Sequence, residues 1–156
     1  MVRKIIKIGQ VADNRKARFS YSIDDTIEAG ISLTGAELKS ARYGLVNIID
    51  GFVQKRSDSL FLAGIVIQPL PTAAKIVIFD ERRPRQLLLH RSQINKLIGK
   101  LQDKGATVVP LKLYFNDRGK LKVLLGVGYG KNKIDKRETI KQREWNKNKS
   151  RILKKS

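Results

Sequence analysis

Apolar and polar residues alternate with a period of two along several short stretches of the chain. In residues 19–23 and 27–33, aromatic and aliphatic side chains occupy every second position. This period is typical of strands that have one buried and one solvated face. Asp24 and Asp25 interrupt the pattern, and we expect them to form the turn between two strands.

Further stretches of the same kind predict an antiparallel sheet built largely from hairpins. Strands are expected at residues 52–56 and 60–67, which are joined across residues 57–59, and shorter strands are expected at residues 75–79 and 86–89. The clearest hairpin comes last, where residues 108–115 and 120–127 flank a turn at residues 116–119. Gly119 supplies the positive φ that such a turn requires.

Two helices interrupt the strands. Thr34 and Glu37 form the T-x-x-E pattern of a capping box, which predicts a helix that begins here and stops at Gly44. Apolar residues at positions 94, 97, 98 and 101 indicate a second helix, with Ser92 as its expected N-cap and Gly105 as its end. The predicted fold class is mainly β: a small antiparallel OB-like barrel with two or three short helices and a basic C-terminal tail.

The charge of the chain identifies that tail. Lys and Arg outnumber Asp and Glu by 33 to 14, which gives a formal net charge of +19. Residues 1–130 hold 22 basic and 11 acidic residues, whereas residues 131–156 hold 11 basic and 3 acidic residues and few apolar ones. We therefore expect a folded RNA-binding domain over residues 1–130. Residues 131–156 should be disordered when free and become helical against a polyanion.

The residue inventory excludes several classes of function. Cysteine is absent and histidine occurs once, as His90. Disulfides, cysteine-zinc sites and iron–sulfur clusters are therefore excluded, and we expect no metal site and no cofactor. The densest acidic cluster is Asp24, Asp25 and Glu28, and turn formation accounts for it better than a metal-dependent nuclease site. No apolar run is long enough to span a membrane and the N-terminus is unlike a signal peptide, so we expect a cytoplasmic protein without enzymatic activity.

Basic residues from separate segments are the best candidates for contact with a nucleic acid. They are Arg15, Lys16, Lys39, Arg42, Arg118, Lys120 and Lys122. If the fold brings them together, they would contact phosphates. Arg82, Arg83 and Arg85 around Pro84 have the pattern of an ordinary solvated loop. Aromatic residues make up only 6% of the chain, which favours recognition of folded RNA by its shape over stacking on bases.

A set of short motifs in a fixed order covers nearly the whole chain. They are NRKAR at 14–18, EAGI at 28–31, LTGAELKS at 33–40, RPRQLLLH at 83–90, VPLKLYF at 109–115, DKR at 135–137 and IKQRE at 140–144. Any one of these motifs is unremarkable, but the ordered set is highly specific. In this combination the chain resembles the SsrA-binding protein (SmpB) family.

The resemblance implies a non-catalytic role in bacterial trans-translation. Such a protein binds the tRNA-like domain of tmRNA and delivers it to stalled ribosomes, with elongation factor Tu in the delivery complex. Carried over by position, the tmRNA face would comprise Asn14, Arg15, Lys16, Glu37, Lys39, Ser40 and Arg42, with Lys120 and Lys122 as neighbours. Glu37 would accept hydrogen bonds from base or 2′-hydroxyl donors in addition to its part in the capping box.

The resemblance also implies that the tail probes the empty mRNA channel and the decoding centre of the small ribosomal subunit. The ribosome-binding residues would be Lys131, Ile134, Asp135, Lys136, Arg137, Ile140, Lys141, Arg143 and Trp145. Ile134 stands where the family usually has a tyrosine or histidine that can stack on an rRNA base. The loop of residues 70–79 lacks the Tyr and Gly-Asn residues found in many relatives, so no contact is assigned to it.

Two alternatives from other classes stay open at this point. A ribosomal structural protein is also basic, free of cysteine and tailed, and stable co-sedimentation with empty ribosomes would favour it. An RNA-cleaving enzyme would need a catalytic site that the residue inventory barely supplies. Loss of RNA integrity in the presence of Mg²⁺ would favour that second alternative.

Overall fold

The computed structural model describes residues 5–71, 78–131 and 142–147. Its strands are β1 (Gly9–Asp13), β2 (Tyr21–Ile31), β3 (Val46–Asn47), β4 (Phe52–Arg56), β5 (Ser59–Ala63), β6 (Val66–Ile67), β7 (Arg85–Leu88), β8 (Ala106–Phe115) and β9 (Leu121–Gly130). Its helices are α1 (Arg15–Ser20), α2 (Gly35–Arg42) and α3 (Arg91–Leu101), and residues 142–147 are also helical. None of the helices in these ranges is both long and apolar enough to cross a membrane.

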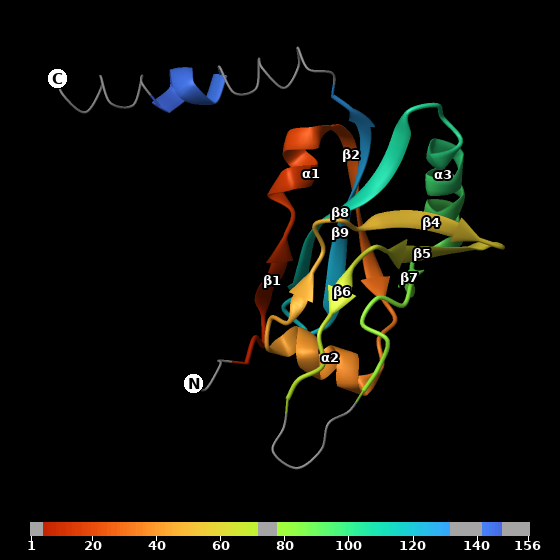
Figure 1. Cartoon of the computed structure of the whole chain (residues 1–156). Coiled ribbons are helices and arrows are strands. Elements are labelled where there is room, and N and C mark those ends of the chain that lie inside the picture. The colour runs from red at the N-terminus through yellow and green to blue at the C-terminus, as the bar shows by residue number, and fades with distance from the viewer. Residues whose placement is uncertain (1–4, 72–77, 132–141, 148–156) are drawn as a thin grey trace.

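Seven strands form one antiparallel sheet in the order β1-β8-β9-β2-β7-β5-β4, while β3 and β6 pair as a separate ribbon. The long strands β8, β9 and β2 lie next to one another in this sheet. Helix α1 lies at one end of the sheet and α2 at the other (Figure 1). The prediction of a mainly β, antiparallel fold with a few short helices is confirmed.

The predicted barrel does not close by hydrogen bonding among the described residues. β1 pairs only with residues 112–115 of β8, so the first half of β8 has a free edge on that side. Residues 48–52, which lead into and begin β4, pack against this edge, and a Cβ added at Gly51 would lie 2.6 Å from Cγ of Pro110. Proline has no N–H to donate to a neighbouring strand. We call this boundary between residues 48–52 and the first half of β8 the seam.

The hydrophobic core fills the inside of the curved sheet. β9 contributes Leu121, Val123, Leu125 and Val127, each at most 8% exposed, and these side chains alternate with outward-facing ones. A smaller cluster on the outer side joins Ala17 of α1 to Val109 and Leu111 of β8. A bulge in β8 between Pro110 and Lys112 allows the strand to serve both clusters.

The turn predicted at Asp24 and Asp25 is wrong. β2 runs without a break from Tyr21 to Ile31, and its register against β9 shifts between Ile23 and Asp25. β9 offers a partner along this whole length, so the backbone keeps its ladder and absorbs the extra residue as a bulge. Lys96 of α3 pairs with Asp25 at 2.8 Å.

Other boundaries also differ from the sequence-based expectation. β1 and α1 were not predicted, and the expected strand at residues 60–67 divides into β5 and β6. His90, not Ser92, is the N-cap of α3, and its N–H donates to Oε1 of Gln93 at 3.1 Å. The strand expected at residues 75–79 lies largely outside the described residues. The two hairpins at 57–59 and 116–119 and the helix after Thr34 are confirmed.

Candidate nucleic-acid interface

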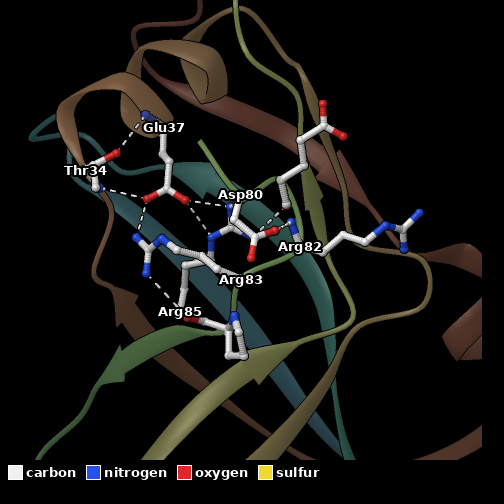
Figure 2. A network of polar contacts seen from close by, with 8 residues as sticks. Thr34, Glu37, Asp80, Arg82, Arg83 and Arg85 are labelled. Atoms are coloured by element: carbon white, nitrogen blue, oxygen red, sulfur yellow. Dashed lines mark hydrogen bonds and ion pairs between the residues drawn. The ribbon is translucent and has the colours of Figure 1, made fainter. Parts of the chain in front are cut away.

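Glu37 lies at the centre of a buried ion-pair network between α2 and the loop before β7 (Figure 2). The capping box is complete, because Thr34 Oγ1 accepts from the Glu37 N–H at 3.2 Å and Glu37 Oε1 accepts from the Thr34 N–H at 2.9 Å. Arg83 also donates to Oε1, while Arg85 donates to Oε2 through Nε at 2.8 Å and forms an ion pair in which its Nη2 lies 2.6 Å from Oε2. Both carboxylate oxygens are therefore occupied.

The network keeps Glu37 ionised although it is buried. Burial by itself raises the pKa of the Glu37 carboxyl, but hydrogen bonds from Arg83, the Thr34 amide and Arg85 outweigh that effect, and the pKa lies below its ordinary value. Arg85 also donates to the carbonyls of Glu81 at 3.0 Å and Asp80 at 3.3 Å. The network thus ties residues 80–85 to the first turn of α2.

This geometry corrects two expectations. The side chains of Glu37 and Arg85 are 0% exposed, so the Glu37 carboxylate does not face a base or a 2′-hydroxyl at the surface. Arg83 and Arg85 are not part of an ordinary solvated loop, because the only carboxylate that reaches them in the described residues is Glu37. Sequence spacing shows the capping box but gives no sign of partners 46 and 48 residues away.

Two further residues assigned to the tmRNA face are buried. Asn14 is 0% exposed, and its Oδ1 accepts from the Ala17 N–H at 3.1 Å as the N-cap of α1. Its Nδ2 donates to the carbonyls of Pro110 at 2.8 Å and Ile48 at 3.3 Å, so Asn14 bridges the seam. Ser40 is also 0% exposed, and its Oγ has no hydrogen-bond partner among the described residues.

The exposed basic candidates divide between the two ends of the sheet. At the α2 end, Arg42 donates to the carbonyls of Ile6 at 3.1 Å and Gly119 at 3.4 Å, and its guanidinium carbon lies 4.4 Å from the centre of the Phe115 ring. These contacts join α2 to the turn between β8 and β9. We call Lys39, Arg42, Arg118 and Lys120 the basic end, and all four lie at least partly at the surface.

An outer face of the sheet continues from the basic end. Lys122 of β9 stands opposite Tyr114 of β8, and the Tyr114 hydroxyl donates to the Glu28 carboxylate of β2. Burial and the Glu28 charge raise the pKa of Tyr114 to about 12. Leu88 of β7 pairs with Gly30 beside Lys122 and is 55% exposed. Sequence reasoning named Lys122 but did not name Tyr114 and Leu88 as neighbours on this face. The available signal was the alternation of inward-facing and outward-facing residues along each strand.

Arg15 and Lys16 lie at the other end of the sheet, on α1 (Figure 1). Their side chains are 97% and 65% exposed. Lys131 follows β9 here, where its N–H donates to the Ser20 carbonyl at 3.0 Å. The predicted tmRNA face therefore does not form one patch.

The tail lies only partly within the described residues. Ile134, Asp135, Lys136, Arg137, Ile140 and Lys141 fall outside them. Arg143 and Trp145 belong to the described helical segment at residues 142–147 and are exposed. The guanidinium carbon of Arg143 lies 5.9 Å from the centre of the Phe19 ring on α1. Among the described residues, no cluster of three or more His, Asp or Glu side chains could hold a metal ion.

Comparison with known proteins gives one consistent result. A protein-family model described as SmpB protein matches residues 11–155. The SsrA-binding protein of Methylorubrum populi is 52% identical over 143 residues, which cover 92% of this chain and 90% of that protein. The SsrA-binding protein of a Bradyrhizobium species (strain BTAi1) is 49% identical over 151 residues, which cover 97% and 96% of the two chains.

A solved structure agrees with these relatives. A chain from the study "tmRNA-SmpB: a journey to the center of the bacterial ribosome" is similar to this protein with a TM-score of 0.66 and 41% identity. The similarity covers 86% of this chain and 94% of the other.

Proposed function

The chain belongs to the SmpB protein family, and on that premise we propose that it binds tmRNA and brings it to stalled ribosomes for trans-translation. It is an RNA-binding protein with no enzymatic activity of its own. The observation that carries the proposal is the identity of about half of the residues, over nine-tenths of both chains, to SsrA-binding proteins.

The tRNA-like domain of tmRNA binds at the basic end and along the outer face in this proposal. Lys39, Arg118 and Lys120 have no carboxylate partner among the described ion pairs. Tyr114 and Leu88 add flat and apolar surface beside Lys122. Positive charge positions the phosphate backbone, while the less polar face adds contacts that depend on the shape of the RNA.

Glu37 and Asn14 act indirectly in this proposal. Both are buried, and both fix backbone segments that carry exposed residues. Glu37 holds residues 80–85 against α2, which ends at Arg42. Asn14 caps α1, which carries Arg15 and Lys16. We therefore expect substitutions at these two positions to act on RNA binding through protein stability and not through a lost RNA contact.

Residues 131–156 form the ribosome-binding part of the proposed mechanism. The tail takes up its helical form in the empty mRNA channel, with Asp135, Lys136 and Arg137 at the decoding centre and Ile140, Lys141 and Arg143 along the channel. Ile134 packs its aliphatic side chain against a base there. Support comes from the charge of this segment and from the position of Lys131 beside α1, at the end of the sheet opposite the basic end.

Two other elements of the proposal rest on the family alone. Delivery occurs together with elongation factor Tu, to which we assign no surface of this protein. The site of action is the cytoplasm, since that is where bacterial ribosomes translate.

Binding of the purified protein to the tRNA-like domain of tmRNA tests the proposal. The affinity is measured across a salt series and compared with that for a plain RNA duplex of equal length. Purely electrostatic binding falls steeply with salt and treats both RNAs alike. We expect the preference for the tRNA-like domain to persist at high salt. Equal, salt-labile affinities for the two RNAs, with stable co-sedimentation with empty ribosomes, would contradict the proposal and favour a ribosomal structural protein.

A further inference from the structure

The seam contains a hollow that the proposed contacts leave unused. It has a volume of about 390 Å³ and lies between α1, residues 49–52 at the start of β4, and the first half of β8. Thr107 and Val109 line it from β8, and Tyr21 lines it from the start of β2. It occurs where the sheet does not close, because no strand ladder joins residues 49–52 to the first half of β8.

Buried contacts hold these walls in place. Asn14 donates to the Ile48 carbonyl on one side and the Pro110 carbonyl on the other, and it caps α1 above them. Gly51 allows the loop to approach closely, because a side chain there would collide with Pro110 and with Ile65, whose Cγ2 would be 2.8 Å away. The hollow is therefore a fixed feature of the fold.

Its rim combines flat apolar surface with positive charge. Phe52 and Ile49 line it and are 43% and 44% exposed, so both present apolar surface to solvent. Lys16 Nζ lies 3.5 Å from Asp50 Oδ1, and the two side chains are 65% and 81% exposed. An ion pair this exposed contributes little to stability, so a phosphate can replace Asp50 as the partner of Lys16.

The hollow lies where the chain leaves the sheet for the tail. Ser20 lines the hollow, and its carbonyl accepts the N–H of Lys131 at 3.0 Å. Lys131 Nζ also donates to the Arg18 carbonyl at 3.4 Å. A partner that holds the tail is thus brought to this end of the sheet, away from the basic end where we place tmRNA.

We propose that the hollow receives one unpaired base of the small-subunit ribosomal RNA, stacked on the Phe52 ring, with the adjoining phosphate on Lys16. The inference rests on the proposed function, since it takes the tail to be bound in the ribosome. Aromatic rings stack on any base face, and a cation beside the ring attracts the backbone. Phe52 therefore supplies a stacking surface despite the low aromatic content of the chain.

The test compares three full-length variants with the wild type. Phe52→Leu keeps an apolar side chain but removes the flat ring, and Phe52→Trp keeps a ring. Ile78→Ala is the matched control, because Ile78 is an exposed apolar residue, at 84%, that does not line the hollow. Each protein is assayed for affinity to the tRNA-like domain of tmRNA and, in complex with tmRNA, for affinity to ribosomes stalled on a truncated message. Chemical probing records the protection of unpaired small-subunit bases.

We expect Phe52→Leu to weaken ribosome binding by a factor between about 5 and about 150, the range of one base–aromatic stack. One small-subunit base should lose its protection, while affinity for tmRNA stays unchanged. Phe52→Trp should retain both the affinity and the protection, and Ile78→Ala should match the wild type. Because Leu preserves the apolar contacts of the ring, this comparison does not depend on a variant that fails to fold.

Two results would overturn the inference. In the first, Phe52→Leu binds stalled ribosomes and protects small-subunit bases as the wild type does. In the second, Phe52→Leu loses affinity for tmRNA alone, which would place the stacked base in tmRNA. Failure of the proposed function is seen separately, because the wild type would then show no preference for the tRNA-like domain.

Discussion

Glu37 and Arg85 form an ion pair in which neither side chain is exposed, with Nη2 of Arg85 2.6 Å from Oε2 of Glu37. Removing two charges from water is costly, and such a pair is tolerated only when further hydrogen bonds satisfy both groups. Here the capping box, Arg83 and the carbonyls of Asp80 and Glu81 provide them. The pair therefore fixes a helix start and a loop at the same time.

Glu37→Gln is expected to lower the free energy of unfolding by roughly 3–5 kcal/mol. Glutamine keeps the size of the side chain but leaves the buried Arg85 charge uncompensated. Asp50→Asn is the matched control, because it breaks the exposed pair with Lys16 and should cost less than about 1 kcal/mol. Urea unfolding measures both variants, and equal stabilities for the two would refute the structural role of Glu37.

The contribution of Glu37 should also depend on pH in a defined direction. Its pKa in the folded protein lies below the ordinary value of 4.5, so the folded state binds the proton less readily than the unfolded state. The stabilisation is therefore fully present above about pH 4.5 and is lost as the pH falls through the folded-state pKa.

Unfolding of the wild type and Glu37→Gln at about pH 7, 5, 4 and 3 measures this effect. The difference in stability should be constant at the upper two values and shrink at the lower two. Other acidic groups, such as Asp13 and Asp25, titrate in both proteins and cancel from the difference. A difference that widens with acid would contradict a lowered pKa of Glu37 in the folded protein.

Arg118→Ala and Lys120→Ala should each weaken binding to the tRNA-like domain of tmRNA without changing stability. Both residues lie on the turn between β8 and β9, at the surface. The logarithm of the affinity falls linearly with the logarithm of the salt concentration, and each lost phosphate contact should reduce the slope of that line by about one. Lys104→Ala, which removes an exposed lysine after α3, is the control and should leave affinity and slope unchanged. An unchanged slope for the turn variants would remove this turn from the interface.

Ser40→Ala should leave the protein as stable as the wild type or slightly more stable. The Ser40 hydroxyl is buried and has no partner among the described residues, so its removal relieves the cost of burying an unpaired polar group. Affinity for tmRNA should not change. A marked loss of that affinity, at unchanged stability, would restore Ser40 to the RNA face.

Deletion of residues 132–156 should leave tmRNA binding largely intact and abolish tagging of stalled chains. The cut keeps Lys131, whose N–H donates to the Ser20 carbonyl, so the end of β9 stays attached to α1. Gel shifts with tmRNA and a tagging assay on a truncated message measure the two activities. Normal tagging by the shortened protein would exclude the tail from the mechanism.

The parts of the fold that could be predicted from sequence are those determined by neighbouring residues. The Thr34–Glu37 capping box and the turn at residues 116–119 each depend on four consecutive positions, and both are present. The bulge at Ile23–Asp25 could not be predicted, because it depends on β9, about a hundred residues further along the chain. Polar residues within a strand look like a turn until the partner strand is known.

Sequence motifs name residues for the candidate site but do not give its geometry. Motif positions identified Asn14, Glu37 and Ser40, all of which are buried. A motif gives the position of a residue along the chain but not whether its side chain faces solvent. Burial depends on Arg85, Pro110 and Ile48, which lie 34 to 96 residues from their partners.

The bridge at Asn14 has a consequence for synthesis of the protein. The Asn14 amide donates to the carbonyl of Pro110, which lies 96 residues downstream. Strand β1, just before Asn14, pairs only with β8. The first hundred residues to emerge during translation therefore include the Asn14 amide without the nearer in space of its two carbonyl partners, and a strand β1 without its partner strand. Long-range pairing of this kind forms slowly. A product cut short before β8 cannot assemble this sheet, so production of the folded protein requires a message that is read nearly to its end.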